Sequence, residues 1–177
     1  MAARCNAVIL ARLISCGGVI GIMFYNTEQH ETLKVLEDNY VVIRDEYKAV
    51  MNESIPWPEV SLHNGKWRTY GIKFKGSYLP NACPKTTETI KSIPGVYIAG
   101  FSILKAGCVI KPHQGYTDSV WRSHLGIICP DNCWIKVEGV THKWKEGEVV
   151  VFDDTNTHEA ANEGDQDRVV LIVDIKK

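Results

Sequence analysis

The spacing of hydrophobic positions changes along the chain and divides it into a helical lead-in and a longer strand-rich part. Between Thr27 and Met51 apolar residues recur at alternating spacings of three and four, with charged residues between them. This period predicts an amphipathic helix with one buried stripe, formed by Leu33, Leu36, Tyr40, Ile43, Tyr47 and Val50. Asn26 or Thr27 is the expected cap at its start, and Asn52 follows its end.

After Pro58 short apolar runs alternate with turn signals, as is typical of antiparallel strands. A short helix is expected over Thr86–Ile93, ahead of a Pro-Gly turn. The predicted strands are Trp67–Phe74, Val96–Leu104, Cys108–Ile110, Val120–Ile128, Trp134–Val137, Glu148–Phe152 and Val169–Ile175. Many short strands after a helical lead-in predict a mainly β fold, a jelly roll or barrel with the N-terminal and flanking helices packed outside it.

The N-terminal 25 residues form a separate apolar segment, followed by one predicted domain over residues 26–177. The run Ala7–Tyr25 is about long enough to cross a bilayer, although Arg12 within it costs roughly 2.5–3.5 kcal/mol on insertion scales. Three interpretations stay open for this run: a membrane anchor, a buried strand or helix, and an extension that packs on nothing. The expected location is therefore cytoplasmic or membrane-associated.

Composition narrows the class of protein further. The chain has 177 residues, 20 basic and 21 acidic, and a net charge of -1. Because it has no basic run or stripe, a nucleic-acid partner is excluded. The six cysteines lack a zinc-site spacing, so free thiols in a reducing compartment are expected, with a local Cys129–Cys133 disulfide as the alternative.

Two histidines carry the first sign of chemistry. His113 follows the predicted strand Cys108–Ile110, and His158 follows an Asp-rich turn after Glu148–Phe152. Strand ends of a small barrel converge on its rim, and two neutral imidazoles at such a place can hold a divalent metal. We therefore predict a metal site formed by His113 and His158.

Two arginines suggest an acidic ligand beside this metal. Arg122 and His124 are two residues apart, so they point to the same face of a strand, and Arg168 opens an apolar run. A buried guanidinium needs an anionic partner, and two of them predict a dicarboxylate. For Arg168 the alternative is a salt bridge at the rim with Asp165 or Asp167.

The order and spacing of these residues resemble the aspartyl/asparaginyl β-hydroxylase family, continuously from Trp67 to Asp174. The helix at Thr27–Met51 also resembles the lead-in of that family. The motifs that carry the resemblance are Phe101-Ser102-Ile103-Leu104, Gly107, Pro112-His113-Gln114-Gly115, Arg122-Ser123-His124-Leu125-Gly126, Trp144 with Glu146-Gly147, Phe152-Asp153-Asp154, His158-Glu159 and Arg168. The resemblance implies a double-stranded β-helix, a cupin-like jelly roll. It also implies an Fe(II)- and 2-oxoglutarate-dependent dioxygenase that uses molecular oxygen.

Carried over residue by residue, the resemblance implies that His113 and His158 bind iron. It also implies that 2-oxoglutarate is held by Ser102, Arg122, His124 and Arg168. One departure is that Gly115 stands two residues after His113, where most non-haem iron oxygenases place a carboxylate. The animal protein hydroxylases of the family share this glycine, whereas its lipid A hydroxylases have an acid. Asp118 is a substitute ligand to consider.

The acids before the second histidine have a different expected role. Asp153 and Asp154 are expected to be partners of His158 rather than ligands.

The predicted substrate is the β-carbon of Asp or Asn in a peptide or protein. One alternative is a lipid-linked substrate, as for the lipid A hydroxylases, favoured if residues 7–25 associate with a membrane. The other is a jelly-roll module without catalysis that binds a metal or a small acid, for which Gly115 is the best support.

Overall fold

The structure, a computed structural model, describes residues 22–177. Most of the apolar run at residues 7–25 lies outside the described residues, and its prediction as a membrane anchor stays a prediction. Across the part that is described, no helix combines the length and hydropathy that a bilayer span requires.

The helical lead-in forms as predicted but in shorter pieces: η1 (Glu31–Leu33), α1 (Lys34–Asp38), α2 (Tyr40–Val50) and η2 (Met51–Glu53). The predicted stripe is buried except for Tyr40, which is half-buried. α1 ends at Asp38, and the side-chain amide of the next residue, Asn39, donates to the Val35 carbonyl at 2.8 Å. The predicted cap at Asn26 or Thr27 is wrong, because Asn26 accepts the Glu28 N–H in a preceding turn and the Thr27 hydroxyl donates to Glu37.

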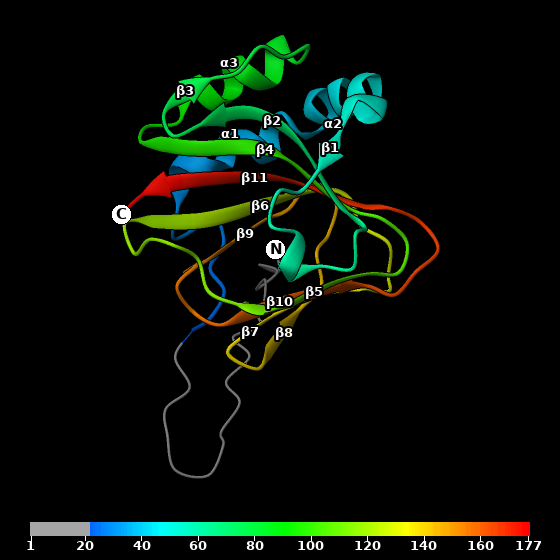
Figure 1. Ribbon diagram of the computed structural model, residues 1–177. Coiled ribbons are helices and arrows are strands. Elements are labelled where there is room, and N and C mark those ends of the chain that lie inside the picture. The colour runs from blue at the N-terminus through cyan, green and yellow to red at the C-terminus, as the bar shows by residue number, and fades with distance from the viewer. Residues whose placement is uncertain (1–21) are drawn as a thin grey trace, which may run out of the picture.

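Two antiparallel sheets form the body of the protein (Figure 1). The larger, seven-stranded sheet has the order β1-β2-β4-β11-β6-β9, with β3 paired to β2. Its strands are β1 (Ile55–Pro56), β2 (Trp67–Phe74), β3 (Ser77–Tyr78), β4 (Val96–Leu104), β6 (Val120–Ile128), β9 (Val149–Phe152) and β11 (Arg168–Lys176). The smaller, four-stranded sheet has the order β5-β10-β7-β8. Its strands are β5 (Cys108–His113), β7 (Cys133–Val137), β8 (Val140–His142) and β10 (His158–Asn162).

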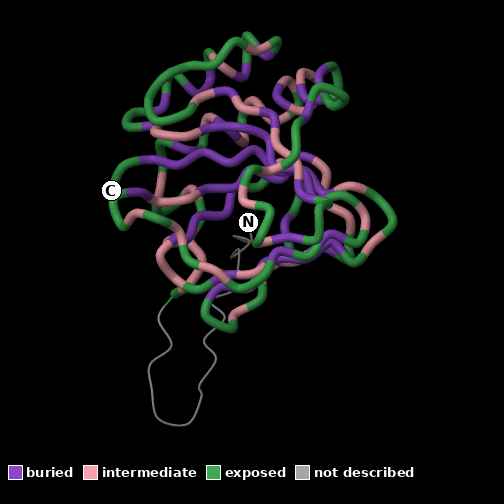
Figure 2. Tube along the Cα trace, in the orientation of Figure 1, coloured by how far each residue is buried: buried purple, intermediate pink, exposed green. Residues whose placement is uncertain are grey.

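The larger sheet is buried on both faces, as the purple central strands of Figure 2 show. Along β11, Val169, Leu171 and Val173 belong to the core shared with the helices, whereas Val170 and Ile172 belong to the core shared with the smaller sheet. This alternation explains why β11 is a continuous apolar run rather than an alternating one. The helices cover one face and the smaller sheet covers the other, which confirms the predicted jelly roll with helices outside.

α3 (Pro84–Ser92) begins two residues before the predicted start because Pro84 occupies its first turn. The Glu46 carboxylate of α2 accepts the backbone N–H groups of Lys85 and Thr86 at 2.9 and 2.7 Å. These contacts fix α3 beside α2. The four described cysteines, Cys83, Cys108, Cys129 and Cys133, are free thiols, so the alternative of a Cys129–Cys133 disulfide is wrong.

The residues just before the lead-in also belong to the fold. Tyr25 forms a bridge with Val151 of β9, through two backbone hydrogen bonds of 2.8 Å. The Phe24 ring lies 5.0 Å from the ring of His142 in β8 and 6.2 Å from that of Phe152 in β9. This segment therefore contacts both sheets where the edge strands β8 and β9 approach each other.

Candidate active site

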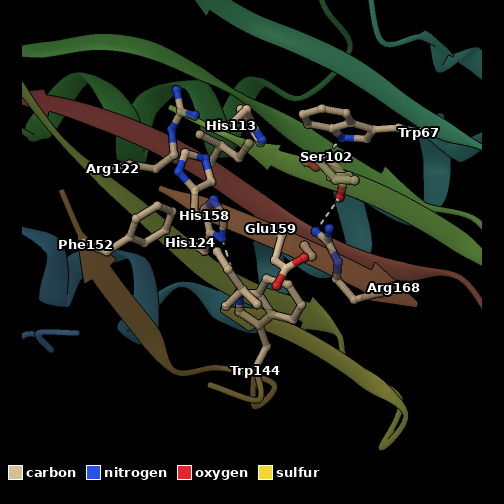
Figure 3. Close-up of a pocket in the computed structure, with 14 residues that line it drawn as sticks. Trp67, Ser102, His113, Arg122, His124, Trp144, Phe152, His158, Glu159 and Arg168 are labelled. Atoms are coloured by element: carbon tan, nitrogen blue, oxygen red, sulfur yellow. Dashed lines mark hydrogen bonds between the residues drawn. The ribbon is translucent and has the colours of Figure 1, made fainter. Parts of the chain in front are cut away.

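A cavity opens between the two sheets and contains every residue that the sequence predicts for the site (Figure 3). Its lining is Trp67, Ser102, Ile110, His113, Arg122, His124, Ile135, Trp144, Phe152, His158, Glu159, Ala160, Arg168 and Ile172. The larger sheet contributes Ser102, Arg122, His124 and Arg168, and the smaller sheet contributes both predicted metal ligands. The structure thus brings the six residues together, while their roles stay predictions.

His113 and His158 face each other across two neighbouring strands, β5 and β10. Their ring centroids are 4.2 Å apart. The Nδ1 atoms lie 2.8 Å from the carbonyls of Lys111 and Asn156, respectively. A carbonyl only accepts, so each Nδ1 carries the proton and each Nε2 keeps its lone pair. Burial also lowers the pKa of His158 to about 4, which keeps that ring neutral.

The space beside Gly115 is taken by the carboxylate of Asp154. A Cβ at position 115 would lie 1.9 Å from Asp154 Oδ2. Asp154 is 3% exposed, and its Oδ1 lies 3.4 Å from His158 Nε2 and 2.6 Å from Arg122 Nη1. The missing side chain at Gly115 therefore makes room for a carboxylate from elsewhere in the chain, which lies beside His158 Nε2 without a hydrogen bond to it. The role of Asp154 as a partner of His158 stays a prediction.

The other acids near the histidines have different surroundings. Asp153 accepts hydrogen bonds from Thr155 and pairs with Lys177, so it is not a partner of His158. Asp118 is exposed. Among residues 22–177, no three or more His, Cys, Asp and Glu side chains are grouped closely enough to hold a metal. The predicted metal ligands are thus a pair of imidazoles with Asp154 beside them, and metal binding by this pair stays a prediction.

Arg122 has anionic partners within the protein itself. Its Nε and Nη2 donate to the two carboxylate oxygens of Asp174 at 3.0 and 2.8 Å. Burial alone would lower the pKa of Arg122, but the carboxylates of Asp174 and Asp154 raise it. Asp174 is opposite Arg122 in the register of β6 and β11. This pair was not predicted from the sequence, although an acid inside an apolar strand signals a cation nearby.

Arg168 is buried without such a partner. It is 2% exposed and forms no salt bridge with any carboxylate that the structure describes. Asp167 pairs with Lys105 at 2.6 Å instead, so the alternative of a rim salt bridge to Arg168 is wrong. Burial lowers the pKa of Arg168 to about 10, and its Nε has no hydrogen-bond partner among the described residues. A buried cation in this state is suited to an anionic ligand.

Two tryptophans support the remaining polar residues of the cavity. The Trp67 indole donates to Ser102 Oγ at 2.9 Å, and the Trp144 indole donates to His124 Nδ1 at 3.2 Å. The Arg168 guanidinium lies 4.4 Å from the centroid of the Trp144 ring and donates to the Ser102 carbonyl at 3.3 Å. Burial lowers the pKa of His124 well below its ordinary value, and Arg168 lowers it further. Neither tryptophan was predicted from the sequence to have a role in the site.

Comparisons with known proteins point to one family. The sequence model of the family described as Aspartyl/Asparaginyl beta-hydroxylase matches residues 37–177. The ornithine lipid ester-linked acyl 2-hydroxylase of Rhizobium tropici is 33% identical over 168 residues, which cover 86% of this chain and 60% of that protein. The human aspartyl/asparaginyl beta-hydroxylase is 33% identical over 158 residues, which cover 82% of this chain but only 21% of that protein. This chain therefore spans less than two thirds of either relative.

Solved structures agree on the fold alone. A Pseudomonas putida prolyl-4-hydroxylase superposes with a TM-score of 0.55 at 15% identity, covering 82% of this chain and 98% of that one. The non-heme alpha ketoglutarate dependent epimerase SnoN superposes with a TM-score of 0.58 at 11% identity, covering 81% and 74%.

Proposed function

Because this chain belongs to the aspartyl/asparaginyl β-hydroxylase family, we propose that it is an Fe(II)- and 2-oxoglutarate-dependent oxygenase that hydroxylates an unactivated C–H bond. The observation that carries the proposal is Arg168. It is a buried cation without a carboxylate partner among the described residues, and it shares one cavity with a pair of imidazoles. An acidic co-substrate beside a metal accounts for both features.

The imidazoles of His113 and His158 fit a first-row transition metal, because imidazole is a ligand that suits iron. Their protons are on Nδ1, so both Nε2 atoms are free to bind it. Bound iron would supply the activation of molecular oxygen, coupled to conversion of 2-oxoglutarate to succinate and carbon dioxide. Asp154, held by Arg122, adds a negative charge next to His158. In most non-haem iron oxygenases the third ligand is a carboxylate, which offsets part of the positive charge of the metal. Here the charge of Asp154 would take over part of that effect.

The side chains that the larger sheet contributes to the cavity fit 2-oxoglutarate. Arg168 supplies a charge-assisted donor for a carboxylate, and Ser102 and His124 supply polar groups on the same wall of the cavity. Arg122 differs from the expectation, because two aspartates already neutralise it. We therefore assign the binding of 2-oxoglutarate mainly to Arg168. Arg122 contributes to the electrostatic field of the site and holds Asp154 in position.

The test is succinate formation that requires iron, oxygen and 2-oxoglutarate together. Arg168→Met keeps an extended side chain without the charge and should weaken 2-oxoglutarate binding by about 100-fold, as expected for a hydrogen-bonded charge pair. Lys105→Met is the matched control, because Lys105 is a partly exposed cation paired with Asp167 outside the cavity. His158→Ala should abolish turnover. The proposal fails if the parent protein forms no succinate and shows no iron-dependent binding of 2-oxoglutarate.

For the substrate we propose the β-carbon of Asp or Asn in a peptide or protein, as the family description suggests. The second candidate is a lipid-linked acyl chain, supported by the relative named ornithine lipid ester-linked acyl 2-hydroxylase and by the apolar run at residues 7–25. Mass spectrometry of peptide and lipid pools, searched for a gain of one oxygen, distinguishes them. Binding of iron and 2-oxoglutarate without turnover on either pool would indicate the non-catalytic module instead.

A further inference from the structure

Both indole N–H groups in the cavity wall bond to side chains of the proposed co-substrate site (Figure 3). Trp144 donates to His124 Nδ1, and Trp67 donates to Ser102 Oγ. An indole nitrogen can only donate a hydrogen bond, so the direction of both bonds is settled by chemistry. The protein thereby occupies an acceptor site on each of the two side chains.

For His124 this contact determines the tautomer. Since Nδ1 accepts from Trp144, the proton of the neutral ring is on Nε2. Protonation of Nδ1 as well would place one N–H directly against another. The Nε2 atom is buried and has no hydrogen-bond partner among the described residues. His124 therefore presents an unpaired N–H donor within the cavity wall.

Ser102 and Arg168 complete a set of donors. Ser102 Oγ accepts from Trp67, and its own hydroxyl proton is donated to no residue that the structure describes. The Nε–H of Arg168 is also without a partner there. Glu159, an acid that lines the same cavity, is paired with Lys136 at 2.9 Å. Ser102, His124 and Arg168 thus each have a proton available to a ligand. Ser102 Oγ keeps one lone pair, whereas His124 and Arg168 have no acceptor left.

Gly126 explains how Trp144 reaches His124. Gly126 continues the row of alternate positions that contains Arg122 and His124 on β6. A Cβ at position 126 would lie 2.1 Å from the Lys145 carbonyl oxygen, so only glycine lets this backbone pass. The Gly147 N–H then donates to the Gly126 carbonyl at 3.0 Å. This close crossing places the indole of Trp144 both beside His124 and beneath Arg168.

We propose that Trp144 is a positioning residue that makes His124 donor-only, as Arg168 is, and that Trp67 orients the hydroxyl of Ser102, so that the site selects a ligand group that only accepts hydrogen bonds, namely an ionised carboxylate. This rests on the proposed function for the identity of the ligand, but not for the state of the side chains. A carboxamide or a protonated acid would place one of its own donors against His124 or Arg168, which leaves buried donors unpaired and is strongly unfavourable.

The first experiment needs neither metal nor ligand. Nitrogen-15 NMR of histidine-labelled, metal-free protein at neutral pH should show His124 with an unprotonated Nδ1 and a protonated Nε2, assigned by the loss of these signals in His124→Gln. Trp144→Phe should shift the Nδ1 signal toward the protonated form. A protonated Nδ1 in the parent protein, or an unchanged tautomer in Trp144→Phe, overturns the proposal. Either result is obtained whether or not the protein is a hydroxylase.

The second experiment measures selectivity by calorimetry with Mn(II)-loaded protein, using 2-oxoglutarate and its 5-carboxamide analogue. Trp144→Phe and Trp67→Phe should each lower the affinity for 2-oxoglutarate about tenfold and reduce the preference over the amide. Replacing Trp144 by its benzothiophene isostere, which keeps the ring and lacks the N–H, should have the same effect. Trp134→Phe is the control, since Trp134 contacts Lys136 on β7 and does not line the cavity. Unchanged preference in both cavity variants contradicts the proposal.

Discussion

The Asp154 carboxylate fills the space that a side chain at position 115 would need. Introducing a methyl group at this position, by Gly115→Ala, tests this directly. A Cβ there would lie 1.9 and 2.5 Å from Asp154 Oδ2 and Cγ, and 3.0 Å from the Asp154 carbonyl oxygen. Gly115 is not among the glycines with positive φ, so Gly115→Ala introduces no backbone strain of that kind. The effect of the substitution therefore comes from the collision with a buried carboxylate.

The magnitude follows from overpacking. Forcing a methyl group into a filled, buried site costs about 1–3 kcal/mol of the free energy of unfolding. Asp154→Ala removes the two shortest contacts and leaves only the 3.0 Å contact to the backbone. It costs about 1–3 kcal/mol itself, because Arg122 loses one carboxylate but keeps the two hydrogen bonds to Asp174. In the Asp154→Ala background, Gly115→Ala should therefore cost less than about 1 kcal/mol.

The assay is a double-mutant cycle by urea unfolding of the metal-free protein. A coupling of about 0.5–3 kcal/mol between the two substitutions is expected, as is common for residues in contact. Gly164→Ala is the matched control, because its Cβ would meet only Asn162 and Asn132 at the ordinary distances of 3.4 and 3.6 Å. If Gly115→Ala costs the same with and without the Asp154 carboxylate, the reasoning is refuted.

Two further predictions concern stability. Asp174→Ala should destabilise the protein by about 1.5–3 kcal/mol in urea unfolding, because the half-buried Arg122 loses its bidentate partner and keeps only Asp154; a change below about 1 kcal/mol would contradict this. The metal-free protein should also lose stability as the pH falls from 6.5 toward 4. The pKa of His158 is about 4 in the folded state and 6.5 in the unfolded chain, so the unfolded chain binds more protons in this window. The loss is about 3 kcal/mol at most, and His158→Gln should flatten it; an equal pH dependence in that variant would exclude His158 as the cause.

The parts of the fold with strong apolar periods could be predicted from the sequence. Trp67–Phe74, Val96–Leu104 and Val120–Ile128 are strands with the predicted bounds. β10 was missed, because His-Glu-Ala-Ala-Asn has no β-branched residue and takes its strand form from pairing with β5 and β7. The strand before His113 was predicted too short, since β5 continues through Pro112, which is tolerated because β5 is an edge strand.

In the site, the residues that line the cavity could be predicted from the sequence, but the partners of their side chains could not. Spacing and resemblance were enough to predict that His113, His158 and Arg168 share a cavity, because strand alternation fixes the face on which each residue lies. Sequence spacing could not show that Arg122 is already neutralised, since Asp154 and Asp174 are brought to it by tertiary folding. The donor role of Trp144 was also beyond spacing, because it depends on a backbone crossing at Gly126.

The bridge between Tyr25 and Val151 covers part of an edge of the larger sheet. β9 is an edge strand of the larger sheet and pairs with β6 on one side. Within residues 22–177, the bridge to Tyr25 is the pairing on its other side. A free strand edge is a template for pairing with another chain, and proteins commonly blunt such edges with a short covering segment. Removal of the chain through Tyr25 would uncover this edge together with the aromatic surface of Phe152. Self-association and aggregation are the consequences to expect from such a truncation.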